Sequence, residues 1–130
     1  MISILMTTMR RLQAAVATIN LLHETTVGHE IEVICVVDAD KETANAVNAM
    51  KFSRKDFQVI VLYNPVIRTS SVGINQGLAI AKGEYITFSS DDSGWHQGWL
   101  DTTLKAHAEK QITAQAEQRR QNRRRFLSNA

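Results

Sequence analysis

The sequence predicts an open α/β fold in which a mostly parallel sheet of about four strands is flanked by helices. Apolar runs of strand length recur along the chain, and segments with helical spacing of apolar residues lie between them. This regular alternation of strand and helix is typical of parallel sheets that are built from right-handed crossovers. No sequence repeat or low-complexity linker interrupts the pattern.

The first expected strand is the short apolar run ISILM at residues 2–6. A helix is expected after it, because apolar residues then recur at helical spacing, at Leu12, Ala15, Val16, Ile19 and Leu22. Either Thr7 or Thr8 would cap this helix by accepting a hydrogen bond from a free backbone amide. Gly28 is expected to stop it.

The second strand is expected within residues 30–40, EIEVICVVDAD, which end abruptly at Asp38 and Asp40. Its continuous apolar stretch resembles a central parallel strand that is covered on both faces. Asp40 is well placed to cap a second helix that runs to about Met50.

The remaining elements follow the same alternation. A third strand at 57–63 is broken by Asn64-Pro65, because proline cannot donate a hydrogen bond to a sheet ladder. A helix around 72–82 leads to a fourth strand at 84–90, and a last helix begins near Gly98.

Composition indicates one globular domain of 130 residues, with 44% hydrophobic and 22% charged side chains. No apolar run approaches the ~20 residues that span a bilayer. The opening is apolar first and basic afterwards, the reverse of a signal peptide, so the cytoplasm is the expected compartment. Cys35 is the single cysteine, and its apolar surroundings predict an inert core thiol.

The net charge of +2 hides an asymmetry between body and tail. Residues 110–130 carry six basic side chains and one acidic one, which is +5, so residues 1–109 carry nine basic and twelve acidic ones, which is −3. This basic segment is expected to be a solvated helix or a disordered tail. A nucleic-acid partner is not favoured, because an arginine run without interleaved aromatic residues is weak support for one.

Polar side chains follow each expected strand: Thr7 and Thr8, then Asp38 and Asp40, then Asn64, then Ser89 to Asp92. Ligands of such sheets bind beyond the carboxyl ends of the strands, so we expect one site there. Taken alone, each residue has a structural reading as a cap, a turn former or a solvated loop residue.

The spacing of these residues excludes several kinds of site. The first turn, TTMRR, has no glycines for a dinucleotide, and no P-loop follows any strand. The four histidines lack zinc-ligand spacing. An acidic loop at 91–92 remains, and it suits a hard divalent cation that bridges carboxylates to a phosphate.

Four segments together resemble the family 2 glycosyltransferases. ISILMTTMRR is similar to a strand that runs into Pro-Thr-Tyr-Asn-Arg, and EIEVICVVDAD is similar to a strand that ends in an acidic turn. GINQGLAIAKGEYITFSSDD resembles the motif that closes in Asp-x-Asp, and HQGWL resembles the Pro-Gly-Trp-Leu helix start. The four segments come in family order over residues 2–104.

The resemblance implies a Rossmann-like GT-A half-domain over residues 1–109 that binds a nucleotide-diphosphate sugar. By this resemblance, Asp38 would contact the base or ribose of a nucleotide, usually uridine. The implied nucleotide-binding residues are Thr8, Asp38, Asp40, Asn75 and Asp91. Asp92, with Asp91, would bind Mg²⁺ or Mn²⁺. The implied activity is transfer of a sugar from a UDP-linked donor to an acceptor, and no residue is assigned as the general base.

The sequence also departs from the family pattern. Thr7 replaces the proline, Met9 the tyrosine and Arg10 the asparagine of the opening motif, and Ser90 stands where the first acid of Asp-x-Asp is expected. The resemblance covers the donor-binding half of the family pattern and not the acceptor half. The alternative hypothesis is therefore a truncated, catalytically inactive nucleotide-sugar-binding or interaction module, and either reading predicts self-association through uncovered apolar surface.

Overall fold

A computed structural model describes residues 1–113 and 125–126 of the chain. Its sheet is parallel throughout and has the order β3-β2-β1-β4-β5. The strands are β1 (Ile2–Thr8), β2 (Ile31–Asp38), β3 (Phe57–Asn64), β4 (Tyr85–Ser89) and the two-residue β5 (Arg125–Phe126). The predicted open α/β fold with about four parallel strands is confirmed. The short β5 was not predicted, because two residues carry no periodic pattern.

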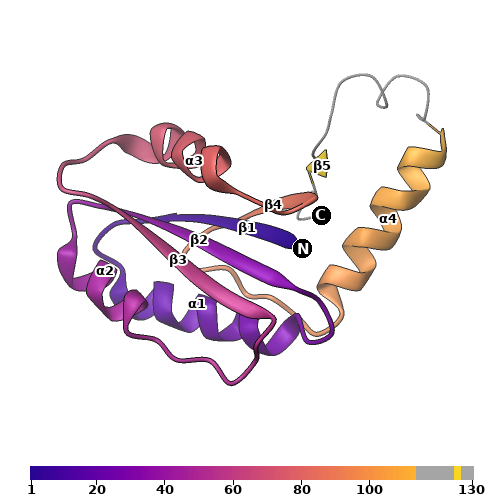
Figure 1. The fold of residues 1–130 in the computed structure, drawn as a ribbon, viewed down its shortest axis with the longest axis horizontal. Coiled ribbons are helices and arrows are strands. Elements are labelled where there is room, and N and C mark those ends of the chain that lie inside the picture. Colours follow the sequence, from indigo (N-terminus) through magenta and orange to yellow (C-terminus); the bar gives the residue numbers. More distant parts are fainter. Residues whose placement is uncertain (114–124, 127–130) are drawn as a thin grey trace.

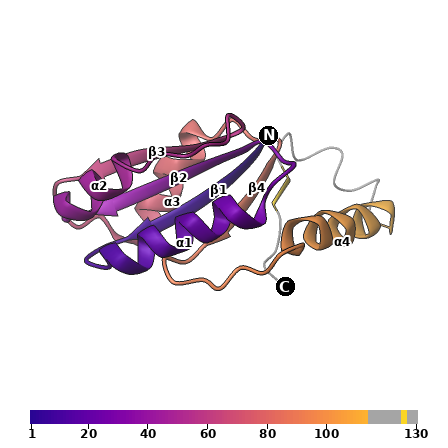
Figure 2. The same ribbon diagram turned by 90° about the horizontal axis from the view of Figure 1, so that it is seen from below.

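Helices cover both faces of this sheet (Figures 1 and 2). The helices α1 (Leu12–Thr25) and α2 (Lys41–Asn48) lie on one face, and α3 (Thr69–Ile80) lies on the other. The fourth helix, α4 (Trp99–Thr113), projects beyond the sheet on the side where the strands begin. The sheet therefore forms the middle of three layers.

The strand order reverses once. From β1 the chain moves outward through β2 to β3, and after α3 it returns to the other side of β1 to form β4. Right-handed crossovers in opposite directions place their helices on opposite faces, which explains why α3 faces away from α1 and α2. The switch point between β1 and β4 is where open α/β sheets bind ligands.

The core has one cluster of buried side chains on each face. The larger lies under α1 and α2 and includes Ile4, Ile19 and Val33, and the smaller lies under α3 and includes Leu5 and Ile34. Every residue of β2 is buried, including Glu32 and Asp38, and the apolar run from Val33 to Val37 predicts a strand that is covered on both faces. On α3, a Cβ added to Gly73 would stand 2.9 Å from Thr7 Cγ2, so this glycine allows the helix to approach β1 closely.

Cys35 lies in the centre of β2 and is fully buried. Desolvation, with a smaller contribution from the charge of Asp91, raises the pKa of its thiol from 9.0 to about 12. The thiol therefore stays protonated at neutral pH, which confirms the prediction of an inert core cysteine.

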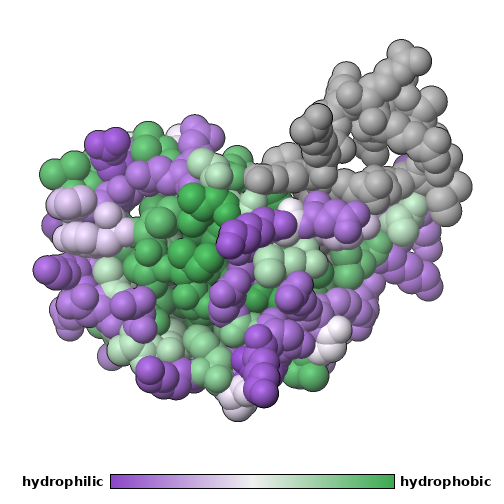
Figure 3. Space-filling model, in the orientation of Figure 1, coloured by the Kyte–Doolittle hydropathy of each residue, from purple (hydrophilic) through white to green (hydrophobic). Residues whose placement is uncertain are grey.

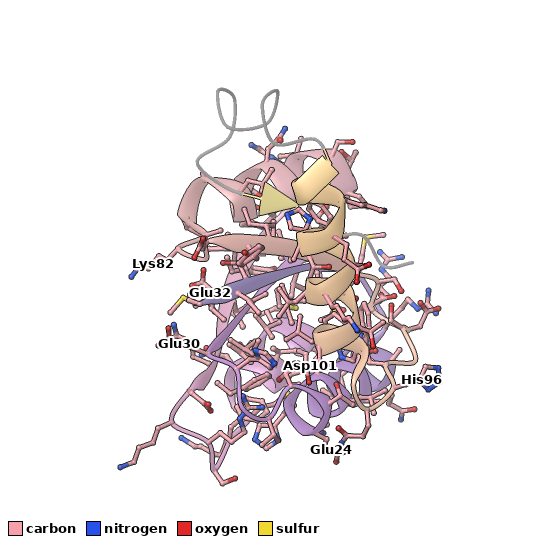
Figure 4. All side chains as sticks on the ribbon, turned by 90° about the vertical axis from the view of Figure 1, so that its right-hand side faces the viewer. Glu24, Glu30, Glu32, Lys82, His96 and Asp101 are labelled. Atoms are coloured by element: carbon pink, nitrogen blue, oxygen red, sulfur yellow. The ribbon has the colours of Figure 1, made fainter. Side chains whose placement is uncertain are left out.

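Glu32 is a buried carboxylate at the amino end of the sheet. Its Oε2 accepts hydrogen bonds from Ser3 Oγ at 2.5 Å and from the Lys82 backbone amide at 2.6 Å. Figure 4 shows Glu32 beside the segment that carries Lys82. These bonds tie the end of α3 to β1 and β2, at the edge opposite to the polar strand ends.

The two helix caps predicted from the sequence have different outcomes. Asp40 caps α2 by accepting a hydrogen bond from the Thr43 backbone amide at 3.2 Å, as predicted. The cap predicted at Thr7 or Thr8 is wrong, because both threonines belong to β1 and α1 begins later, after Arg11, without a side-chain cap. Parallel pairing with β2 extends β1 as far as Thr8 and leaves neither threonine at the helix start.

Only part of the predicted tail at 110–130 lies among the described residues. Helix α4 continues to Thr113, and Arg125–Phe126 pair with Tyr85–Ile86 of β4. The arginines at 119, 120, 123 and 124 lie outside the described residues, so the reading of the tail stays a prediction. Within the described residues, no helix combines the length and the apolar character that a membrane crossing requires.

Candidate functional site at the carboxyl edge of the sheet

A pocket of about 340 Å³ opens at the carboxyl edge of the sheet, within the range of ~300–1,000 Å³ that is usual for ligand pockets. Its walls come from the ends of β1, β2 and β4 and from the start of α3. The lining residues are Thr7, Thr8, Met9, Val36, Asp38, Ile67, Thr69, Ser70, Gly73, Ser90 and Asp91. Thr8 and Asp91, which are 83 positions apart in the chain, therefore meet at the switch point of the fold.

Asp38, the last residue of β2, is 9% exposed and is held by three donors. Its Oδ1 accepts a hydrogen bond from Asn64 Nδ2 at 2.9 Å, and its Oδ2 accepts from the backbone amides of Arg68 at 2.9 Å and Thr69 at 3.0 Å. A carboxylate offers about four lone-pair sites, so roughly one remains for a ligand in the pocket. Asp38 thus both fixes the loop before α3 and presents an acceptor to the pocket.

Asn64 extends this network away from the pocket. Its Nδ2 also donates to Gln76 Oε1 at 2.8 Å, and Gln76 Nε2 donates back to Asn64 Oδ1 at 3.0 Å. This reciprocal pair of bonds joins the end of β3 to α3 and fixes the orientation of the Asn64 amide. Gln76 was missed from the sequence, because no local pattern indicates which face of α3 meets Asn64.

Thr8 and Asp91 face each other across the switch point. Thr8 Oγ1 donates a hydrogen bond to Asp91 Oδ2 at 2.9 Å, and Thr18 Oγ1 of α1 donates to the Asp91 carbonyl at 2.8 Å. Both Thr8 and Asp91 are buried. The loop after β4 is therefore anchored to β1 and α1, and the Asp91 carboxylate is held in a defined position.

Arg11 bridges the two neighbouring carboxylates of this loop. Its Nη1 lies 3.6 Å from Asp91 Oδ1, and its Nη2 lies 3.0 Å from Asp92 Oδ2. Ser90 Oγ donates to Asp92 Oδ1 at 2.9 Å. The hydrogen bond from Ser90 and the positive charge of Arg11 hold the pKa of Asp92 below its ordinary value. Asp92 is therefore ionised at neutral pH.

Among the described residues, three that are not glycine adopt left-handed backbone conformations, and all three lie in the segments between a strand end and the next helix or at the start of that helix. They are Arg10 with φ 58°, Ala39 with φ 47° and Thr69 with φ 77°. Such a conformation is a true outlier for a β-branched residue like Thr69, and strained residues of this kind cluster at functional sites. The hydrogen bond from the Thr69 amide to Asp38 helps to hold the strained residue in place.

The structure brings only some of the predicted nucleotide-binding residues into the pocket. Thr8, Asp38 and Asp91 line it. Asp40 instead caps α2 and accepts a hydrogen bond from the Arg10 amide at 2.7 Å. Asn75 is exposed on α3 and does not line the pocket. Successive side chains of a helix point ~100° apart, so Asn75 and the Gly73 that lines the pocket lie on different sides of α3. Nucleotide contacts by Asp40 and Asn75 stay predictions.

Two tryptophans near the start of α4 pack inward. The ring centroids of Trp95 and Trp99 lie 4.1 Å apart, and both side chains rest against the larger core cluster. Trp95 Nε1 donates to Ser89 Oγ at 3.1 Å. His96 is exposed and points outward from the loop (Figure 4).

The oxygen atoms at the 90–92 loop suit a hard divalent cation. Asp91, Asp92 and the Ser90 hydroxyl supply oxygen donors, and Mg²⁺ typically uses one or two carboxylates together with substrate phosphates. Within residues 1–110, no three His, Cys, Asp or Glu side chains form a complete metal cage. The loop therefore fits a cation that is shared with a ligand better than one bound by the protein alone.

The fold and the pocket together define a doubly wound α/β domain with a pocket at its switch point, where folds of this class bind ligands. Residues 3–127 match the family model described as Glycosyl transferase family 2, and the chain belongs to that family. The resemblance found in the sequence motifs is thereby confirmed. A comparison with curated proteins finds none that matches this chain.

Proposed function

We propose that the pocket binds the nucleoside diphosphate part of a nucleotide sugar, with UDP as the favoured nucleotide, as the donor side of a glycosyl transfer. The observation that supports this most directly is that Asp38 and Asp91, from separate strands, line one pocket at the switch point of a family 2 glycosyltransferase fold. The acceptor would be a saccharide or another hydroxyl-bearing molecule.

In this proposal the two ends of the pocket have different tasks. Asp38, with its three donors in place, uses its remaining acceptor site for a hydroxyl or N–H group of the nucleoside. Thr8 holds Asp91, which lines the pocket, and Ser90 holds Asp92, which lies next to the pocket in the same loop, so in this proposal the diphosphate lies beside both carboxylates.

A Mg²⁺ or Mn²⁺ ion held by Asp92 and Asp91 would neutralise the charge that develops on the departing diphosphate. Two carboxylates ~4 Å apart repel each other by about 4 kcal/mol at an effective dielectric near 20. Arg11 offsets part of this repulsion with one positive charge, and a divalent cation would offset more of it. The residues present thus fit a cation that binds together with the diphosphate.

The direct test is calorimetry with UDP, GDP and dTDP, each with and without Mn²⁺. We expect UDP to bind in the presence of Mn²⁺, and Asp92→Asn to weaken this binding by about tenfold or more, because even outer-shell changes at metal sites cost ~10–100-fold. Glu84→Gln removes an exposed carboxylate at the opposite edge and serves as the matched control. The absence of binding to every nucleoside diphosphate with Mn²⁺ present would refute the proposed function.

We also expect the chain to associate with itself through the α3 face of the sheet. Helix α3 packs on β1 and β2, so Ile60 and Leu62 of the edge strand β3 are only partly buried, and Ile80 is 38% exposed. Figure 3 shows apolar surface in this region, and such patches commonly mark interfaces. Sedimentation should show concentration-dependent dimers that Leu62→Lys abolishes and that Val27→Lys, in an exposed loop, leaves intact. A wild-type monomer at all concentrations would contradict this expectation.

A further inference from the structure

Arg11 occupies the space next to both carboxylates that the proposed function assigns to a divalent cation. Its two terminal nitrogens lie 3.6 Å from Asp91 and 3.0 Å from Asp92, so one guanidinium contacts both side chains. A metal ion bound to the same oxygen atoms would have to replace at least one of these contacts, because two cations cannot share one position between the carboxylates.

Arg11 has the freedom to leave this position. Its side chain is 53% exposed, as is that of Asp92, whereas the Asp91 side chain is only 11% exposed and is anchored by Thr8. Arg11 is also the residue that precedes α1, in a loop whose other arginine, Arg10, has a left-handed backbone. Asp91 is therefore held by contacts besides the one to Arg11, whereas the half-exposed Arg11 side chain has room to turn into solvent.

We propose that Arg11 is a resident counter-cation that makes metal binding depend on the diphosphate. This inference rests on the proposed function. Without a nucleotide, the metal ion must displace Arg11 and leave a guanidinium without its partners. When a diphosphate is present, its oxygen atoms offer Arg11 a new bidentate anion, which is the geometry that guanidinium groups favour. The exchange of partners then favours the metal ion at Asp91 and Asp92.

The proposal predicts a coupling between the two ligands that can be measured in both directions. If UDP raises the affinity for Mn²⁺, then Mn²⁺ must raise the affinity for UDP by the same factor. Arg11 contributes to this factor by weakening Mn²⁺ binding in the absence of UDP and by contacting the diphosphate in its presence. Removing the guanidinium should therefore reduce this coupling factor in two ways: it strengthens Mn²⁺ binding in the absence of UDP, and it removes a contact to the diphosphate in its presence.

The experiment measures Mn²⁺ affinity by electron paramagnetic resonance of free Mn²⁺, with and without UDP, for the wild type and for Arg11→Gln. We expect Arg11→Gln to bind Mn²⁺ alone about tenfold more tightly than the wild type, which corresponds to ~1.4 kcal/mol. The gain in Mn²⁺ affinity on adding UDP should fall by a similar factor. Arg11→Lys keeps the charge but cannot contact both carboxylates bidentately, so we expect its affinity for Mn²⁺ alone to lie between those of the wild type and Arg11→Gln.

Arg10→Gln is the matched control, because it removes the same charge from the neighbouring residue, whose backbone amide bonds to Asp40 and not to the 90–92 loop. An Arg11→Gln variant with the Mn²⁺ affinity of Arg10→Gln, measured without nucleotide, would overturn the inference. This comparison needs no nucleotide, so it remains decisive even if UDP does not bind and the proposed function fails. A second outcome would also overturn the inference: UDP binds the wild type equally well with and without Mn²⁺, and Arg11→Gln no longer binds UDP. Arg11 would then take the place of the metal ion.

Circular dichroism of each variant separates these outcomes from loss of folding. Arg11 is half exposed and packs in neither core cluster, so Arg11→Gln should unfold within a few degrees of the wild type. If that variant does not fold, Arg11→Lys decides the question, because an ammonium group cannot bridge both carboxylates bidentately and should raise the affinity for Mn²⁺ alone. An unchanged affinity in that variant would contradict the proposal.

Discussion

Replacing Asp38 with alanine is expected to abolish UDP binding and to lower the free energy of unfolding by about 2–4 kcal/mol. The carboxylate receives one side-chain and two backbone hydrogen bonds, and it is 9% exposed. Its removal leaves one buried and two partly buried donors without this acceptor, and an unsatisfied buried group costs ~1–3 kcal/mol. The loop that positions Thr69 would also lose its anchor, so the pocket would lose both an acceptor and its shape.

Calorimetry with UDP and Mn²⁺ and urea denaturation measure the two effects of this change separately. Asp40→Ala is the control, because Asp40 lies two residues away, caps α2 and does not line the pocket. It should cost about 1 kcal/mol, as loss of a helix cap usually does, and leave UDP binding intact. If Asp40→Ala abolished binding as well, the nucleotide contact that the sequence motif implies for Asp40 would be correct.

Replacing Arg54 with alanine is expected to produce the largest loss of stability, about 3 kcal/mol or more. The guanidinium is 12% exposed and lies between α1, the loop before β2 and the start of β3. It donates to the carbonyls of His23 at 2.6 Å, Thr26 at 3.1 Å and His29 at 2.8 Å, and it pairs with Asp56 at 2.9 Å. Losing it removes a donor from three carbonyls at the end of α1 and in the loop before β2, of which Thr26 keeps a hydrogen bond from the His29 amide at 3.1 Å.

Thermal and urea denaturation measure this effect, and a loss of 3 kcal/mol corresponds to a decrease in Tm of roughly 10 °C for a domain of this size. Arg54→Lys keeps the charge but has at most three donors on one atom, so we expect it to recover about half of the stability. Arg68→Ala is the control, because that arginine is exposed and only its backbone amide is used. An Arg54→Ala variant as stable as Arg68→Ala would contradict the assigned role.

The strand positions could be predicted because they depend on short-range patterns. The run around Val33 to Val37 is apolar at every position, and the structure buries every residue of β2. The Asp40 cap could be predicted because a cap acts over three residues, and its partner is Thr43. The edge of the sheet that carries the pocket could be predicted because the carboxyl ends of parallel strands lie together. Asp38 and Asp91 therefore line one pocket.

The parts of the site that the sequence missed depend on contacts between distant segments. Thr8 was predicted as a helix cap and, from the family resemblance, as a nucleotide-binding residue, but its hydrogen bond to Asp91, 83 residues away, was not predicted. Gln76 meets Asn64 because of the rotation of α3 about its axis, and the neighbouring Asn75 turns outward. The left-handed conformation of Thr69 has no signal in its residue type, because a β-branched residue disfavours it.

The sequence by itself determined the alternation of strands and helices, the polar ends of the strands and membership of a family, since each is written in local periodicity or in ordered motifs. Only the tertiary structure decided which polar side chains hold one another and which face the pocket. It placed Arg11 between Asp91 and Asp92 and left Asn75 exposed. The reason is physical: a hydrogen bond or an ion pair depends on ångström distances between atoms, and these are set by the packing of α1 and α3 on the sheet rather than by spacing along the chain.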